Sequence, residues 1–271
     1  MMHIYKVFSD FLNVSGACDA ASEYCSSLSA HHSSDTVTFY DSNGKLEAER
    51  TMSYVPDVKT TLETVGAIRH CHKYRIVLGS DSGMGKTLVT AALVKLDEKG
   101  DVVFGDGKNG TTENIILLAL VDEILESYEN LEIIFRKLGF PYEFSDLKFS
   151  CDLKLCLTVL GLMGAQSTHS CPYGHCYRYR LKDGKEEKNT RGRWRKEGIR
   201  TLANCRENHH NWLVDGEANP KKLQDFMGCK KPPIPIFGEE FDHVPLISLF
   251  PPMPLHILLG KLIIFIFLFF Y

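Results

Sequence analysis

The chain has 271 residues, of which 44% are hydrophobic and 24% are charged. This composition is sufficient for one large or two small globular domains and excludes a mainly disordered or fibrous chain. The net charge of −3 indicates neither a nucleic-acid nor a membrane partner, so such a partner depends on a local patch. The nine cysteines are odd in number and irregularly spaced, and the first residues lack a secretory signal. We therefore expect a protein that is not secreted and keeps its thiols reduced.

Residues 1–70 carry Ser-rich and His-rich stretches such as CSSLSAHHSSD, which predict a loosely ordered leader that is disordered in part. The pattern then changes, because YRIVLGSD (74–81) is a β-rich run, SGMG is a turn and KTLVTAALVKL (86–96) is a second apolar run. A short DVVF (101–104) follows a polar break. We expect three successive strands joined by tight turns, with TLVTAALV able to be helical instead.

From Thr112 onwards, apolar side chains recur at helical spacing, which predicts one long helix that ends at Gly139 and Pro141. Its apolar stripe consists of Ile115, Leu118, Ile124, Leu125, Tyr128, Leu131, Phe135 and Leu138. LKFSCD (147–152) then predicts a short strand, and LKLCLTVLGL (153–162) predicts a helix. The order of elements fits an α/β fold with a mixed sheet, and a change of composition places a domain boundary near residue 165.

The stretch GSDSGMGKT (79–87) is close to a phosphate-binding loop, although Ser80 stands where that loop has its first glycine. In a nucleotide-binding protein, Gly85, Lys86 and Thr87 would form this loop, with the lysine on the phosphates and the threonine on the metal. A glycine-rich hairpin turn with the lysine in solvent is the alternative.

Another interpretation uses two carboxylates. Asp81 ends the first strand, and Asp152 ends the strand that follows the long helix. If these strands lie side by side, their carboxylates converge at one edge of the sheet and suit Mg²⁺ or Mn²⁺, which prefer oxygen ligands. Such ions support phosphodiester chemistry in ribonuclease-H-like nucleases and transposases. An aspartate at a strand end is otherwise a cap or turn residue.

The region from about 70 to 260 resembles a group of transposon-derived proteins of invertebrates. The similar stretches are HKYRIVLGSDSGMGKTLVTAALV, LESYENLEIIF, LKFSCDLKLCLTVLGLMGAQSTHSCPYG, RTLANCRENHHNWL and LFPPMPLHILLG. Their order is also distantly similar to the catalytic core of Transib transposases and of the V(D)J recombination-activating recombinase. In those proteins an aspartate before a Gly-Met-Gly turn, a strand aspartate and a cysteine pair are similar to Asp81, Asp152 and Cys171.

The resemblance implies a ribonuclease-H-like core over 71–165 and a Cys/His-rich basic insertion with a Pro-rich segment over 166–260. It implies that Asp81 and Asp152 are the first two metal-binding carboxylates. The third acidic ligand has no counterpart before the sequence ends, so we expect a C-terminally truncated site that is incomplete and inactive. The expected protein binds DNA in the nucleus, with or without cleaving it.

The insertion carries residue types that bind zinc and nucleic acid. A tetrahedral zinc site could use Cys171, His175, Cys176, Cys205 and His209, although the first two cysteines are separated by four residues where the family has two. Between residues 178 and 200, ten Lys/Arg accompany four Asp/Glu. Such a basic segment predicts contacts with the DNA backbone, from Arg178, Arg180, Lys182, Arg191, Arg193, Trp194, Arg195 and Lys196. A polar helix surface and a solvated charged loop are the alternatives.

The last eleven residues, 261–271, read KLIIFIFLFFY. They are either a tail anchor or an artefact of the gene prediction. We favour the artefact, because Gly-Lys-Leu (260–262) is the product of translation through a splice donor and because Lys261 interrupts the apolar run that starts at Leu255. The rest of the sequence indicates no membrane partner and no oligomeric state.

Overall fold

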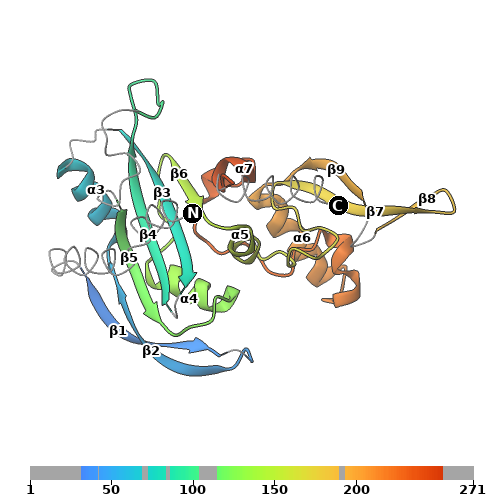
Figure 1. The fold of residues 1–271 in the computed structure, drawn as a ribbon, viewed down its shortest axis with the longest axis horizontal. Helices are drawn as coiled ribbons and strands as arrows, with labels where there is room; N and C mark the ends of the chain where they lie inside the picture. Colours follow the sequence, from blue (N-terminus) through green and yellow to red (C-terminus); the bar gives the residue numbers. More distant parts are fainter. Residues whose placement is uncertain are drawn as a thin grey trace, which may run out of the picture.

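The computed structural model describes residues 32–41, 43–68, 73–83, 86–103, 115–188 and 193–252. These residues form a mixed α/β fold with one six-stranded sheet and one three-stranded sheet. Figure 1 shows the larger sheet at one end of an elongated molecule and the smaller sheet at the other end, with α5 between them.

The larger sheet has the strand order β1-β2-β5-β4-β3-β6. Its strands are β1 (Ser33–Tyr40), β2 (Leu46–Tyr54), β3 (Tyr74–Gly83), β4 (Lys86–Lys95), β5 (Ile115–Asp122) and β6 (Leu147–Ser150). All neighbouring strands are antiparallel except β3 and β6, which are parallel. A parallel pair needs a crossover connection, and the chain between β5 and β6 includes α4 (Tyr128–Lys137).

The smaller sheet is antiparallel and has the order β8-β7-β9. It consists of β7 (Gly174–Lys182), β8 (Lys185–Lys188) and β9 (Arg193–Ile199). The remaining helices are α3 (Val58–Ile68), α5 (Leu153–Val159), α6 (Leu202–Val214) and α7 (Leu246–Leu249), with the 3₁₀ helices η3 (Pro220–Phe226) and η4 (Glu239–Phe241).

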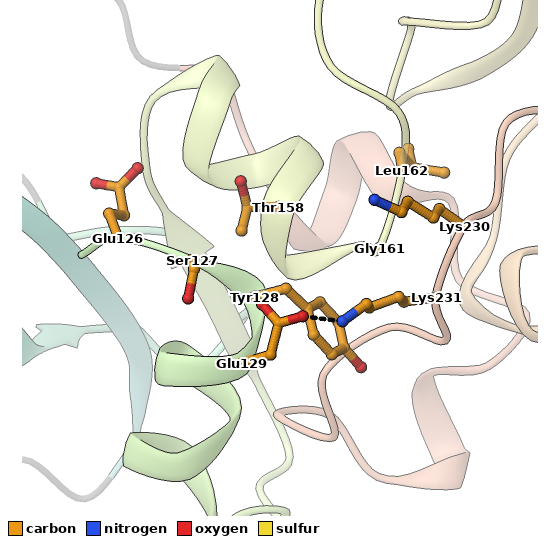
Figure 2. A pocket seen from close by; sticks show the side chains of 9 residues that line it. All are labelled: Glu126, Ser127, Tyr128, Glu129, Thr158, Gly161, Leu162, Lys230 and Lys231. Atoms are coloured by element: carbon orange, nitrogen blue, oxygen red, sulfur yellow. Dashed lines mark hydrogen bonds and ion pairs between the residues drawn. The ribbon is translucent and has the colours of Figure 1, made fainter. Parts of the chain in front are cut away.

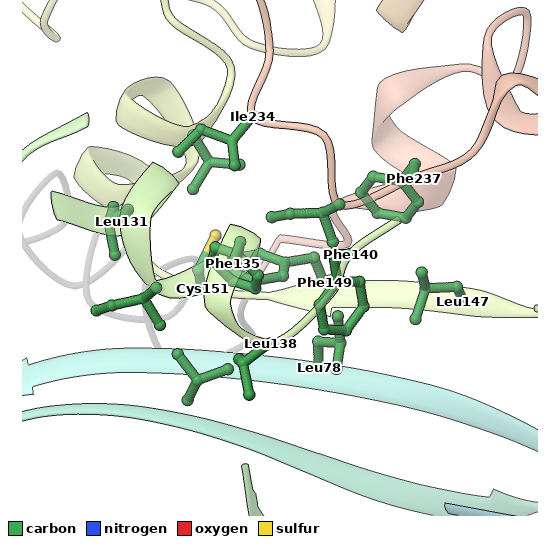
Figure 3. Close-up of a cluster of buried hydrophobic side chains, with 14 of the residues drawn as sticks. Leu78, Leu131, Phe135, Leu138, Phe140, Leu147, Phe149, Cys151, Ile234 and Phe237 are labelled. Atoms are coloured by element: carbon green, nitrogen blue, oxygen red, sulfur yellow. The ribbon is translucent and has the colours of Figure 1, made fainter. Parts of the chain in front are cut away.

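The main core lies where α4 packs on β3 and β6 (Figure 3). Phe135 of α4 and Phe149 of β6 are fully buried and meet edge to face, with ring centroids 5.8 Å apart. The Phe250 ring also packs on the Phe149 ring, with ring centroids 5.7 Å apart. The segment that carries Ile234 and Phe237 packs into the same cluster, although the sequence assigned it to the insertion. The larger sheet therefore depends on the C-terminal part of the chain for its core.

The prediction of a loosely ordered leader over residues 1–70 is wrong for residues 33–68, which form β1, β2 and α3. These elements have a low density of apolar residues because one face of each is solvated. Their inward positions are nevertheless buried, as Phe39 and Met52 show. Residues 1–31 lie outside the described residues.

The prediction of one long helix from Thr112 is also wrong in its first half, because residues 115–122 form β5. β5 pairs with β4, and its residues Ile116, Leu118 and Val121 are buried. A short apolar run is compatible with a buried strand as well as with a helix, so periodicity alone does not distinguish the two. The helix begins later, where Ser127 caps α4 by accepting a hydrogen bond from the Asn130 N–H at 3.3 Å. The DVVF segment contributes only an isolated bridge, from Val102 to Leu96, instead of a strand.

In the part of the chain that the structure describes, no helix has the length and apolar character needed to cross a membrane. The predicted apolar tail at 261–271 lies outside this part.

Candidate metal and nucleic-acid sites

Asp81 and Asp152 lie at one edge of the larger sheet. As predicted, their strands are adjacent and parallel, with Gly79 of β3 opposite Ser150 of β6. Asp81 stands two residues beyond Gly79, within β3, whereas Asp152 stands two residues beyond Ser150 and outside β6, which ends at Ser150. β5 runs parallel to β3, since both are antiparallel to β4, and it ends at Asp122 on the same edge. The topology therefore places Asp81 near the end of β3, Asp122 at the end of β5 and Asp152 shortly after β6.

Asp152 also has a structural role, because it is the N-cap of α5. A capping role for a strand-end aspartate was the alternative to metal binding. Its Oδ1 accepts a hydrogen bond from the Leu155 N–H at 2.7 Å and so begins α5. A carboxylate offers about four acceptor positions, so this cap leaves acceptor capacity for a second partner. Asp81 is exposed, whereas Asp152 is half-buried.

Glu126 is a further acidic residue, and the sequence interpretation missed it. It lies between β5 and α4, its side chain is only 12% exposed, and Lys154 of α5 pairs with it at 3.0 Å. The hydrogen bond to Cys156 and burial raise the pKa of the Cys151 thiol, and the charges of Asp152 and Glu126 raise it further. The expected long helix concealed Glu126, because it would have placed the residue within a turn of that helix.

The predicted phosphate-binding residues Lys86 and Thr87 lie on a strand. Lys86 and Thr87 begin β4, so the turn leads into a strand and not into a helix N-terminus. Thr87 is buried and its Oγ1 lies 2.9 Å from Ser82 Oγ across the hairpin. Lys86 pairs with Asp122 at 3.2 Å. Gly85 lies outside the described residues. Gly83 and Lys86 on either side of it pair with each other in the antiparallel β3-β4 hairpin, which is the alternative interpretation.

The residues at this edge fit a hard divalent ion. Magnesium is commonly bound through one or two carboxylates and keeps several of its waters, which a substrate phosphate can replace. Asp81 and Asp152 match this requirement in ligand type. Among the described residues, no group of three or more histidine, cysteine or carboxylate side chains is arranged to hold a metal ion.

The predicted zinc ligands lie on different elements. Cys171 precedes β7, and His175 and Cys176 belong to it. Cys205 and His209 lie on α6, where both approach Cys229, a cysteine outside the predicted ligand set. The hydrogen bond from Cys229 and the charge of Arg200 lower the pKa of Cys205 in spite of burial. Zinc binding stays a prediction.

The basic segment forms the ribbon β7-β8-β9, and its own carboxylates pair with several of its cations. Arg195 donates to both oxygens of Glu186 at 2.6 and 2.5 Å. Glu187 pairs with Arg180 at 3.5 Å and with Lys182 at 3.9 Å. The local positive field is therefore weaker than the residue count indicates.

The other residues predicted to contact DNA differ in their exposure to solvent. Arg193 is exposed, and Arg178 is half-buried. Strand alternation places Tyr177 and Tyr179 on one face of β7, opposite Arg195 and Arg193 of β9. Arg191 and the side chains of Trp194 and Lys196 lie outside the described residues.

A pocket of about 250 Å³ lies between the start of α4, the end of α5 and the 230–231 segment. Figure 2 shows Lys231 paired with Glu129 and Lys230 extending towards α5. The Lys231 Nζ also lies 4.7 Å from the centre of the Tyr128 ring, whose hydroxyl donates to the Pro232 carbonyl at 2.9 Å. Burial raises the pKa of Tyr128, which keeps this hydroxyl a donor. These contacts fasten the C-terminal segment to α4.

No known protein family matches the sequence, and no curated protein is detectably similar to it. The functional argument therefore depends on the chain's own residues and their geometry.

Proposed function

We propose that the chain is a transposase-derived, ribonuclease-H-like DNA-binding protein with a partial site for Mg²⁺ or Mn²⁺ at Asp81 and Asp152. One observation carries this proposal: Asp81 lies on β3, Asp152 follows the end of β6 by two residues, and these two strands are adjacent and parallel. The three antiparallel strands β3, β4 and β5, the crossover through α4 and the parallel strand β6 support the finer fold assignment.

Each carboxylate has a distinct part in such a site. Asp81 is exposed and can be reached by a phosphodiester, whereas Asp152 is held in one orientation by its bond to the Leu155 N–H. A divalent ion bound there supplies activation of water and stabilisation of the leaving oxygen. Glu126 is paired with Lys154 of α5. The proposed activity is metal-dependent DNA binding. The DNA-binding assay described below also reports whether the bound strand is cleaved.

The proposed DNA contact is the β7-β9 face of the ribbon. Tyr177 and Tyr179 lie with ring centroids 6.2 Å apart, and the strand pairing sets Arg195 and Arg193 beside them. Aromatic rings stack on bases and cations replace the counterions of phosphates. A non-enzymatic DNA-binding protein is the second candidate, because this face needs no metal.

Metal binding is tested by titrating Mn²⁺ into the full chain by calorimetry. Asp81→Asn and Asp152→Asn should each weaken Mn²⁺ binding by at least about tenfold. Asp57→Asn is the matched control, because Asp57 Oδ1 accepts from the Thr60 N–H at 2.9 Å and so begins α3 in the same manner. Unchanged Mn²⁺ affinity in both edge variants would overturn the metal site.

DNA binding is measured by fluorescence anisotropy over a series of salt concentrations, with and without Mg²⁺, on a labelled duplex that also reports cleavage. Arg193→Gln should weaken binding and reduce the salt slope by about one. Lys221→Gln, an exposed change on η3, is the control. Binding that is independent of Mg²⁺ but sensitive to Arg193 would favour the second candidate, and absence of DNA binding would refute both.

A further inference from the structure

The strand β1 forms one edge of the larger sheet (Figure 1) and pairs with β2 on one side only. Its sequence, SSDTVTFY, has none of the lysines or prolines that discourage pairing at the edges of natural sheets. Its one charged residue, Asp35, is paired with Lys137 of α4 at 2.5 Å. Ser34 and Thr36 are exposed. An uncharged edge of this kind is a template for a further strand.

The hydrogen bonds of β2 show which backbone groups of β1 point away from the sheet. The Val55 N–H, directly after β2, donates to the Leu118 carbonyl of β5 at 2.8 Å. Backbone groups alternate sides along a strand, so Tyr54 faces β1, where it lies opposite Ser33. Ser33 and every second residue after it therefore bond to β2. The residues between them direct their N–H and C=O outwards, and they are Ser34, Thr36 and Thr38.

Asn130 of α4 closes the next outward position in the way that a neighbouring strand would. Its buried side chain accepts from the Tyr40 N–H at 2.7 Å and donates to the Tyr40 carbonyl at 3.0 Å. The register shift between Phe39 and Tyr40 adds a residue to β2, so β1 keeps its own alternation up to Tyr40. In the described part of the chain, the outward backbone groups of the three residues before Phe39 that face away from β2 have no partner.

These open positions are the same in both directions from Thr36, because a hydroxyl residue stands two positions away on each side. If a second copy of β1 pairs antiparallel with the first, Thr36 faces the same residue of that copy and Ser34 faces Thr38. Each of these pairs can exchange both of its backbone hydrogen bonds. On the other face of the sheet Asp35 lies opposite Val37, so no like charges stand directly opposite each other. The open edge of β1 is therefore complementary to itself.

We propose that β1 is a dimerisation edge, at which two copies of the chain pair their β1 strands antiparallel about a two-fold axis at Thr36. The larger sheet then continues from one copy into the other. Such an interface uses the same surface of both copies and closes with two of them. The opposite edge of the sheet is β6, which has only four residues and offers a shorter ladder. The pairing requires neither the metal site nor the ribbon.

The test measures the mass of the full chain by sedimentation velocity at protein concentrations of ~1–100 µM. We expect a concentration-dependent equilibrium between a monomer of 30.6 kDa and a dimer of twice this mass. Thr36→Pro removes an outward N–H and leaves the β1-β2 ladder intact, because proline is tolerated in an edge strand where its nitrogen faces outwards. It should raise the dissociation constant of the dimer at least about tenfold.

A charge exchange at the axis tests the register. Thr36→Lys and Thr36→Glu each set like charges opposite each other and should each raise the dissociation constant at least about tenfold. An equimolar mixture of the two variants should dimerise again, because lysine then faces glutamate. Thr51→Lys is the matched control and should leave the dimer unchanged, because Thr51 is exposed and lies opposite Thr36 on β2, away from the edge.

Circular dichroism checks that each variant is folded, and recovery of the dimer in the mixture shows the same independently. A chain that stays monomeric over the whole concentration range would overturn the proposal and show that the edge takes a different strand. A dimer that is unaffected by Thr36→Lys, or a mixture that does not recover, would overturn it as well, because association then uses another surface or another register.

Discussion

Replacing Asp152 separates its capping role from its proposed metal role. Asp152→Ala removes the 2.7 Å hydrogen bond to the Leu155 N–H and leaves the first turn of α5 without its side-chain acceptor. Loss of an N-cap acceptor costs about 1 kcal/mol. Asparagine keeps the acceptor and loses only the charge beside the helix N-terminus, so Asp152→Asn should cost about 0.3 kcal/mol.

These costs are measured by urea unfolding and by thermal unfolding, both followed by circular dichroism. The comparison requires that the variants unfold with the same denaturant slope, the m-value. For a chain of this size, Asp152→Ala should lower Tm by about 2–4 °C and Asp152→Asn by about 1 °C. The same pair of changes at Asp57 should show the same difference in stability, because it caps α3 in the same way. Mn²⁺ affinity should fall only in the Asp152 variants. Equal destabilisation by alanine and asparagine at position 152 would refute the capping argument, and a loss of Mn²⁺ affinity at Asp57 would refute the specificity of the edge.

Three further changes test other parts of the structure. Phe149→Ala removes a fully buried ring from the core and should lower the free energy of unfolding by about 3–5 kcal/mol, measured in urea, and a loss below 1 kcal/mol would contradict the packing. Burial raises the pKa of Glu129, but the hydrogen bond and charge of Lys231 outweigh it, so the net pKa is lowered. Stability from this pair is therefore present above the ordinary carboxyl pKa and is lost as pH falls through the lowered value. Lys231→Met should cost about 0.5 kcal/mol in urea unfolding at neutral pH and progressively less as the pH falls below the ordinary carboxyl pKa, and a cost that does not change with pH would contradict the ion pair. Glu186→Gln releases Arg195 and should strengthen DNA binding in low salt, measured by anisotropy, whereas weaker binding would show that Glu186 orients a contact.

Local signals predicted several elements correctly. The β3-β4 hairpin follows from two β-rich runs around a glycine-rich turn. The apolar stripe of Leu131, Phe135 and Leu138 forms the buried face of α4. LKFS forms β6, and Asp152 begins α5 directly after it. Each of these signals lies within a few residues, which is the range that periodicity and capping report.

The errors occurred where distant residues decide the structure. The run at 115–122 is apolar enough for a helix, and only its place beside β4 makes it a strand. β1 is polar on its solvated face, and it is fixed by β2 and by Asn130 of α4, whose side chain bonds both backbone groups of Tyr40 at 2.7 and 3.0 Å. No local pattern records these contacts, because the partner residues lie far away in the chain.

The sequence by itself determined the acidic residues at strand ends, the hairpin before them and the basic character of the ribbon, because residue type and short-range spacing are local properties. Tertiary structure decided which charges are neutralised and which residues meet. Glu186 and Glu187 pair with cations of the ribbon through strand register, and Glu126 reaches Lys154 across a helix junction. Cys229 meets Arg200 and His209 only because the chain after η3 folds back against α6. Interactions of this kind depend on the free energy of packing the whole chain, which spacing along the sequence does not report.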